Sequence, residues 1–112
     1  MAKGLPFGNI PGLGNMMKQV QKMAEETQRI EQELGEKRIE ASSGGGMVKA
    51  AVNGKGELLE VKIDPQVVDP ADVEMLEDLV VSAIREALEK AVEEKTSRLE
   101  EITGGLNIPG LF

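Results

Sequence analysis

The feature that most constrains this chain is an apolar stripe that keeps a helical period through the last third of the sequence. The stripe follows Asp69-Pro70-Ala71-Asp72 and stops at Gly104-Gly105. An aspartate can cap a first turn and proline suits the first helical position, so we expect Asp69 as the cap and Pro70 as the first residue. Such a helix would contain roughly 30 residues and extend about 50 Å. Its apolar positions are Val73, Leu76, Leu79, Val80, Ala83, Ile84, Ala87, Leu88, Ala91, Val92, Leu99 and Ile102.

A second helix is expected over residues 15–35, where apolar positions alternate at spacings of four and three residues and so form a heptad repeat. Asn15 is the predicted N-cap and Gly35 the predicted stop. This repeat predicts a seam that packs against another helix. The seam positions are Met16, Val20, Met23, Thr27, Ile30 and Leu34.

Three segments between the helices have strand character: Glu36–Ser43, Met47–Asn53 and Glu57–Asp64. The last two alternate, with Val48, Ala50 and Val52 on one face and Leu59, Val61 and Ile63 on the matching face. Gly44-Gly45-Gly46 makes the first connection. The second begins with an Asn-Gly pair, which can adopt the positive φ of a tight hairpin. We therefore predict an α+β protomer of order α-β-β-β-α, with a three-stranded antiparallel meander and two long helices.

The 112 residues suffice for one domain, expected over 15–103. The Gly/Pro-rich segments 1–14 and 104–112 share the sequence Asn-Ile-Pro-Gly-Leu, and we expect flexible tails there, or tails whose apolar residues dock on a partner. Seven-residue strands span roughly 25 Å, so each helix should overhang the sheet and the helices should pair there. A small sheet left open on one face predicts a homodimer.

Composition excludes most enzyme classes. The chain has no cysteine, histidine, tryptophan or tyrosine, and its two phenylalanines are Phe7 and Phe112, so the core should be aliphatic and filled by methionine. Thiolate nucleophiles, imidazole bases and the usual zinc ligands are absent, and the acidic pairs near the end of the second helix have the spacing of a solvated, salt-bridged face. We expect no catalysis, no cofactor and no metal site. No segment has the length of a membrane span or the pattern of a secretory signal, which favours a cytoplasmic protein.

The net charge of −7 opposes contact with polyanions, yet the charge is unevenly distributed. Residues 1–24 carry +3 and no acid, whereas residues 64–112 hold 12 acids and 4 bases. Lys18, Lys22 and Arg29 form a stripe that faces away from the seam. Such a stripe could follow a phosphate backbone. On charge alone a solvated helix face is favoured, because Glu25 and Glu26 flank the stripe.

Four blocks in their order resemble the YbaB/EbfC family of small nucleoid-associated proteins across nearly the whole chain. The first two are Leu13-Gly14-Asn15-Met16-Met17-Lys18-Gln19-Val20-Gln21-Lys22-Met23 and Gly44-Gly45-Gly46-Met47-Val48-Lys49-Ala50-Ala51-Val52-Asn53-Gly54. The other two are Val61-Lys62-Ile63-Asp64-Pro65 and Met75-Leu76-Glu77-Asp78-Leu79-Val80.

The resemblance implies a protomer that dimerises through its sheets and projects long helices like tweezers around duplex DNA. It also implies DNA binding with little sequence preference, at the nucleoid, with effects on chromosome organisation and gene expression and without catalysis. We expect DNA contacts at Lys18, Lys22 and Arg29, with Lys95 and Arg98 on the second helix. In antiparallel helices these two sets should meet near one arm tip. Without aromatic stacking groups outside the tails, contacts should be to the DNA backbone and shape. The alternative is an adaptor that engages DNA-repair or replication proteins through its seam and tails.

Overall fold

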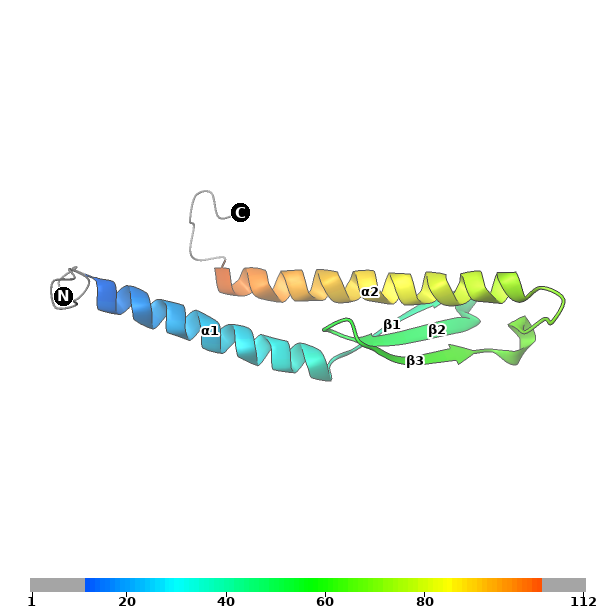
Figure 1. Ribbon diagram of the computed structural model, residues 1–112, viewed down its shortest axis with the longest axis horizontal. Coiled ribbons are helices and arrows are strands. Elements are labelled where there is room, and N and C mark those ends of the chain that lie inside the picture. Colours follow the sequence, from blue (N-terminus) through cyan, green and yellow to red (C-terminus); the bar gives the residue numbers. More distant parts are fainter. Residues whose placement is uncertain (1–11, 104–112) are drawn as a thin grey trace, which may run out of the picture.

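The structure, a computed structural model, describes residues 12–103, and Figure 1 shows a long helix, a three-stranded meander and a second long helix. The predicted α+β class and the element order are confirmed. The elements are α1 (Leu13–Glu36), β1 (Arg38–Ser43), η3 (Gly44–Gly46), β2 (Val48–Asn53), β3 (Leu58–Ile63), η4 (Pro65–Val67) and α2 (Val73–Thr103). The predicted tail 1–14 is wrong at its end, because Leu13 and Gly14 form the first residues of α1. Residues 1–11 of that tail and the second predicted tail, 104–112, lie outside the described residues.

The sheet is antiparallel in the order β1-β2-β3, so β2 is the central strand. The register places Ala41 opposite Ala50, and Ala50 opposite Val61. Figure 1 shows α2 lying along the sheet, where it packs over β1 and β2. We call the face toward α2 the inner face and the opposite face the outer face.

The core between α2 and the inner face is built from small side chains. Ala83, Ala87 and Ala91 recur every four residues on α2, and all three are buried. They meet Ala50 and the two fully buried valines of β2, Val48 and Val52. Alanines at this spacing let the helix axis approach the sheet closely, since a larger side chain would hold the two layers apart.

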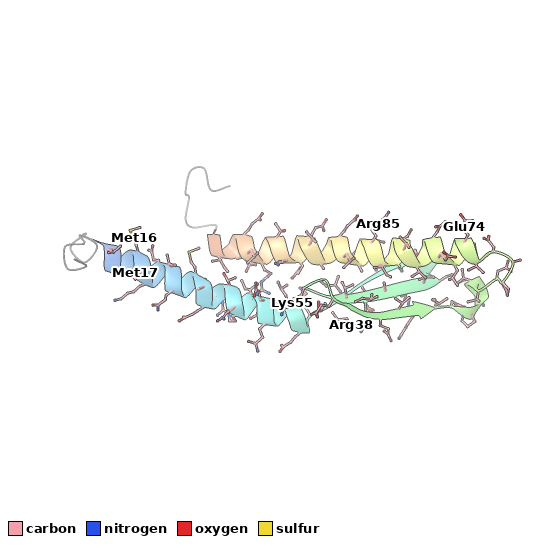
Figure 2. All side chains as sticks on the ribbon, in the orientation of Figure 1. Met16, Met17, Arg38, Lys55, Glu74 and Arg85 are labelled. Carbon is pink, nitrogen blue, oxygen red and sulfur yellow. The ribbon has the colours of Figure 1, made fainter. Side chains whose placement is uncertain are left out.

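The expectation of a methionine-filled core is wrong for the described residues. Met16 and Met17 are more than 60% exposed, at 62% and 64%, and Met75 is also exposed. The buried centre between α2 and the sheet is filled by alanine and valine, and partly buried leucine and isoleucine side chains surround it, while Met16 and Met17 lie on α1 far from the sheet (Figure 2).

Both predicted ends of α1 differ from the structure. The helix begins at Leu13, two residues before the expected start, and its N-cap is Gly12 with φ +81°; Asn15 therefore lies inside the first turn and caps nothing. The helix also continues through Gly35 to Glu36. Gly35 has no positive φ, and an added Cβ would make only an ordinary contact with Lys55 Cε at 3.4 Å, so glycine does not end the helix here.

The start of α2 also differs. Asp69 and Pro70 form a turn in which Asp69 Oδ1 accepts a hydrogen bond from the Ala71 amide at 2.9 Å. The helix begins at Val73, and Asp72 Oδ1 accepts a hydrogen bond from the Met75 amide at 3.2 Å. Asp72 is therefore the cap, and Pro70 precedes the helix.

The Asn53-Gly54 pair has a different role from the one predicted. Positive φ occurs at Gly56, not at Gly54. The Gly54 amide donates to the Leu34 carbonyl at 2.7 Å, and a Cβ on Gly54 would lie 2.7 Å from Leu34 Cδ2. Asn53 Oδ1 accepts from the amides of Lys55 and Glu57. The hairpin turn therefore anchors the end of α1 to the sheet, and close approach is what requires glycine at position 54.

The two helices run antiparallel, and they cover each other only in part (Figure 1). The second half of α1 packs against the C-terminal part of α2, and Ile30 and Leu34 are buried there. The first half of α1 continues beyond the end of α2 (Figure 1). We call this projecting segment, residues 13–24, the arm.

Candidate nucleic-acid interface

The arm carries positive charge that no carboxylate of the described chain neutralises by an ion pair. Between residues 13 and 24 the charged residues are Lys18 and Lys22, and both are exposed. Within residues 12–103, neither lysine has an acidic oxygen within 4.0 Å of its ammonium nitrogen. Two free ammonium groups four residues apart lie on the same side of a helix and can contact successive phosphates.

The opposite side of the arm is apolar. Met16 and Val20 continue the heptad positions that are buried at Ile30 and Leu34, yet on the arm they are 62% and 66% exposed. Figure 2 shows Met16 and Met17 near the tip of α1, far from the sheet. The predicted seam is therefore used only over its second half. The arm has a basic side and an apolar side.

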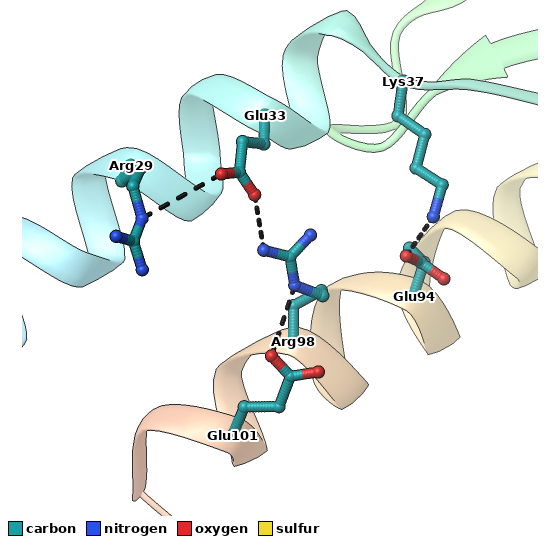
Figure 3. A network of polar contacts seen from close by, with 6 residues as sticks. All are labelled: Arg29, Glu33, Lys37, Glu94, Arg98 and Glu101. Carbon is teal, nitrogen blue, oxygen red and sulfur yellow. Dashed lines mark hydrogen bonds and ion pairs between the residues drawn. The ribbon is translucent and has the colours of Figure 1, made fainter.

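The predicted Arg29 and Arg98 are brought together by a shared carboxylate (Figure 3). Arg98 Nη2 of α2 donates to Glu33 Oε2 of α1, and Arg29 Nε lies 3.9 Å from Glu33 Oε1. Arg98 Nε lies 3.5 Å from Glu101 Oε2. Lys37 and Glu94 form a second ion pair between the end of α1 and α2. The pairs Arg98–Glu33 and Lys37–Glu94 connect the two helices.

Electrostatics follow this geometry. The hydrogen bond from Arg98 lowers the pKa of Glu33 below its ordinary value of 4.5. The same hydrogen bond raises the pKa of Arg98. Two cations facing two carboxylates leave this cluster without net charge, so it has less attraction for phosphate than the arm has.

The structure does not bring all five predicted residues to one place. Lys18 and Lys22 lie about 22 and 16 Å along the helix axis from Glu33, taking 1.5 Å per residue. Lys95 is exposed on α2, one turn before Arg98, and forms no ion pair within residues 12–103. The prediction that the sets meet at an arm tip fails for the lysines, because α2 ends at Thr103 while α1 continues.

The outer face of the sheet is a charged surface that sequence reasoning missed. The register places Lys49 opposite Lys62, and Ala51 opposite both Glu40 and Glu60. Arg38 Nη2 donates to Glu60 Oε1 at 2.6 Å, and this hydrogen bond raises the pKa of Arg38. Charged residues alternate with apolar ones along each strand, so the sequence does indicate a charged face on each strand. Only the register of the strands brings the charges of the three strands together on one surface.

Other site chemistry finds no support in the part of the chain that the structure describes. Residues 12–103 contain no group of three or more acidic, histidine or cysteine side chains placed to hold a metal ion. Within the same residues, neither long helix is apolar enough to cross a membrane.

Comparison with known proteins gives consistent results. The model of the YbaB/EbfC DNA-binding family matches residues 9–106. A nucleoid-associated protein of Thermoanaerobacter pseudethanolicus is 53% identical over 108 residues, covering 94% of this chain and 97% of the relative. A nucleoid-associated protein of Alkaliphilus metalliredigens is 49% identical over 111 residues, covering 98% of this chain and 97% of the relative.

A solved structure shares the fold. The crystal structure of an uncharacterized protein from Helicobacter pylori superposes with a TM-score of 0.60 at 27% sequence identity, covering 70% of this chain and 90% of that one. That protein is itself uncharacterized, so the likeness bears on architecture. The family model and the relatives agree: the chain belongs to the YbaB/EbfC DNA-binding family, a family of nucleoid-associated proteins and not of enzymes.

Proposed function

We propose that this protein binds duplex DNA as a homodimer with little sequence specificity, at the nucleoid, and thereby affects chromosome organisation and gene expression. The observation that carries the proposal is the projecting arm, whose Lys18 and Lys22 are exposed and unpaired within residues 12–103. Backbone phosphates are the same in every sequence, so ammonium contacts to them carry no sequence preference.

Among the five proposed contact residues, the arm lysines carry most of the interaction. Lys95 adds a third exposed ammonium group that forms no ion pair with the part of the chain the structure describes. Arg29 and Arg98 can add longer-range attraction, but Glu33 and Glu101 offset their charge. The remainder of α2 is strongly acidic, so DNA should approach the arm and avoid the acidic faces of α2.

Fluorescence anisotropy of a labelled duplex of roughly 30 base pairs, titrated with protein at several salt concentrations, tests the proposal. The informative variant is Lys18→Gln with Lys22→Gln. The matched control is Lys49→Gln with Lys62→Gln, which makes the same change of net charge on the outer face of the sheet. The arm variant should bind more weakly, and its salt slope should fall by about 2 for each arm of the dimer that contacts the duplex, since each phosphate contact contributes about 0.9.

The control should bind as the unmodified protein does. Equal losses in both variants would show an effect of net charge alone, and a larger loss in the control would move the DNA site to the outer face. Absence of binding at low salt would reject DNA as a direct partner.

The homodimer is proposed through an apolar surface between α2 and β3. Leu59 and Ile63 lie on the inner face of β3, which α2 leaves uncovered, and they are 51% and 40% exposed. Val81, Leu88 and Val92 on the neighbouring side of α2 are also exposed. A patch of this kind, rimmed by charged residues such as Arg85, is typical of a protein interface.

The two edges of the sheet differ in a way that supports this choice. Lys90 Nζ of α2 donates to the Glu40 carbonyl at 3.1 Å and so occupies the edge of β1. Within the described residues no side chain hydrogen-bonds to the backbone of β3, which leaves that edge open to pairing.

Light scattering after size exclusion tests the dimer. The unmodified protein should have twice the protomer mass of 12.0 kDa. Val92→Glu should shift the mass toward the protomer, whereas Val20→Glu, an equally exposed valine on the arm, should not. A mass of one protomer for the unmodified chain would reject the dimer.

The second candidate function is an adaptor for DNA-repair or replication proteins. The apolar side of the arm favours it, because exposed Met16, Met17 and Val20 could bind a partner helix. The lysine variant separates the two candidates: an adaptor keeps its protein partner when Lys18 and Lys22 become glutamine, and a DNA-binding protein loses its DNA.

A further inference from the structure

The apolar side of the arm needs an occupant, whatever the arm's basic side binds. It forms a groove along one side of α1, lined by Leu13, Met16, Met17, Val20, Gln21 and Ala24. Met16, Met17 and Val20 are each more than 60% exposed, at 62%, 64% and 66%. Three large apolar side chains side by side on one helix favour burial against another segment.

We propose that residues 104–112 of the same chain pack along this groove and continue the cover that α2 provides at Ile30 and Leu34. Packing of this segment would not require DNA. Three properties favour residues 104–112 as the occupant of the groove: their place in the chain, their length and their composition.

The ion pair between the helices shows where the segment 104–112 starts relative to α1. Arg98 contacts Glu33, and α2 ends five residues later at Thr103. With 1.5 Å per residue in antiparallel helices, Thr103 lies beside roughly residue 28 of α1. The next residues therefore start at the inner end of the groove, where α2 stops covering the seam (Figure 1).

The length matches the groove. From that point to Leu13 is about 22 Å along the axis of α1. The nine residues 104–112 reach at most about 30 Å when extended. The segment can therefore span the whole groove without any movement of the two helices.

The composition matches as well. Residues 104–112 contain Leu106, Ile108, Leu111 and Phe112 and no charged residue, in a chain that is 29% charged. Burial of these apolar side chains in the groove would lower the free energy of the segment. A short tether that starts at the groove gives an effective concentration in the millimolar range, which favours the same chain over a second copy.

The consequence concerns the arm's basic side. A segment packed on the apolar side would hold the arm straight and keep Lys18 and Lys22 on the opposite, open side. Substitutions in the segment should then change the dynamics of the arm without changing the core, because the groove lies beyond the sheet.

Paramagnetic relaxation on the full chain tests the proposal. The chain has no native cysteine, so Asn107→Cys accepts a single nitroxide label at a polar position. Methyl signals of ¹³C-labelled methionine are the readout: Met16, Met17 and Met23 on α1 should lose most of their intensity. Met47 and Met75 lie at the opposite end of the molecule and should keep theirs.

A matched control separates packing from mere tethering. The same label is placed in a chain carrying Leu106→Ser, Ile108→Ser, Leu111→Ser and Phe112→Ser. Packing predicts that the broadening of Met16 and Met17 largely disappears in this variant. Equal broadening in both chains, or none in either, would overturn the proposal.

A mixing experiment identifies the donor of the segment. Isotope-labelled protein without nitroxide is mixed with nitroxide-labelled protein without isotope. The proposal expects no broadening beyond that of a control mixture with the four-serine chain. Broadening of Met16 and Met17 equal to that within one chain would assign the groove to a second copy and reject the proposal.

Discussion

The half of the molecule backed by the sheet and the arm use similar sequence patterns with opposite results. On α2, apolar residues at helical spacing pack on the sheet, and Ala83 and Ala87 are 0% exposed. On the arm, Met16 and Val20 have the same spacing as Ile30 and Leu34 and remain exposed. A helical apolar stripe therefore predicts a helix, but a neighbouring surface decides whether the stripe is buried.

The strongest test of this difference compares two positions of the same heptad seam. Leu34→Ala removes a side chain that is 1% exposed and should lower the free energy of unfolding by about 2–5 kcal/mol. Val20→Ala on the arm should stay within about 0.5 kcal/mol of the unmodified protein, because the cover proposed for the arm is a short terminal segment that can open without unfolding the domain. Urea denaturation followed by circular dichroism measures both. Similar losses at the two positions would mean that the arm's apolar side is as well covered as the core.

Substitutions that add volume should also destabilise the half backed by the sheet more than the arm, with a smaller loss of stability than Leu34→Ala causes. Ala87→Leu adds volume between α2 and β2 and should cost about 1–3 kcal/mol. Ala24→Leu adds the same volume to an exposed position of the arm and should be neutral. Thermal unfolding of the two variants is the measurement. An unchanged melting temperature for Ala87→Leu would contradict the close packing of helix on sheet.

A comparison of Asn53 with Asn15 tests whether the hydrogen bonds of an asparagine side chain stabilise the fold. Asn53 is 5% exposed; its side chain accepts hydrogen bonds from two backbone amides and donates one to the Gly35 carbonyl. Asn53→Ala should therefore lower the free energy of unfolding by about 1–3 kcal/mol. Asn15→Ala should be neutral or slightly stabilising, because Asn15 lies within α1 and alanine is the better helix former. Denaturant midpoints compare the pair; a cost at Asn15 would restore it as a cap.

The smallest effect is expected at the contact between the two halves. Arg98 lowers the pKa of Glu33, so the carboxylate binds its proton less readily in the folded state than in the unfolded state. The resulting stabilisation is present above the unfolded pKa, near 4.5, and is lost as the pH falls through the lower folded pKa. Glu33→Gln should therefore be slightly less stable than the unmodified chain at pH 7, and the difference should vanish in acid. A constant difference across this pH range would exclude the ion pair as its cause.

Prediction of the fold from sequence succeeded where local signals agreed and failed at the ends of elements. The strands were predicted to within two residues because alternation and glycine turns coincide there. The ends of the helices were predicted wrongly at Asn15, Gly35, Asp69 and Pro70. Residue types that favour helix ends also occur inside helices and in turns. Asp72 is a second candidate for the cap three residues after Asp69, but no local signal favours Asp72 over Asp69.

The sequence predicts the positive charge of the candidate site, but it does not predict which of the cations form ion pairs. Lys18 and Lys22 stand out in an acid-free stretch of the sequence. The ion pairs of Arg29 and Arg98 with Glu33 depend on how far α1 and α2 overlap, and no local pattern contains that information. The same holds for the charges on the outer face, which only the register of the strands assembles.

By itself, the sequence determined the helices, the meander, the aliphatic composition and the basic start of α1, because these depend on the periodicity and chemistry of neighbouring residues. The tertiary structure decided which apolar residues are buried, where α2 ends relative to α1, and which cations are paired. Those outcomes depend on distances between residues far apart in the chain, and such distances are set only when the helices pack on the sheet.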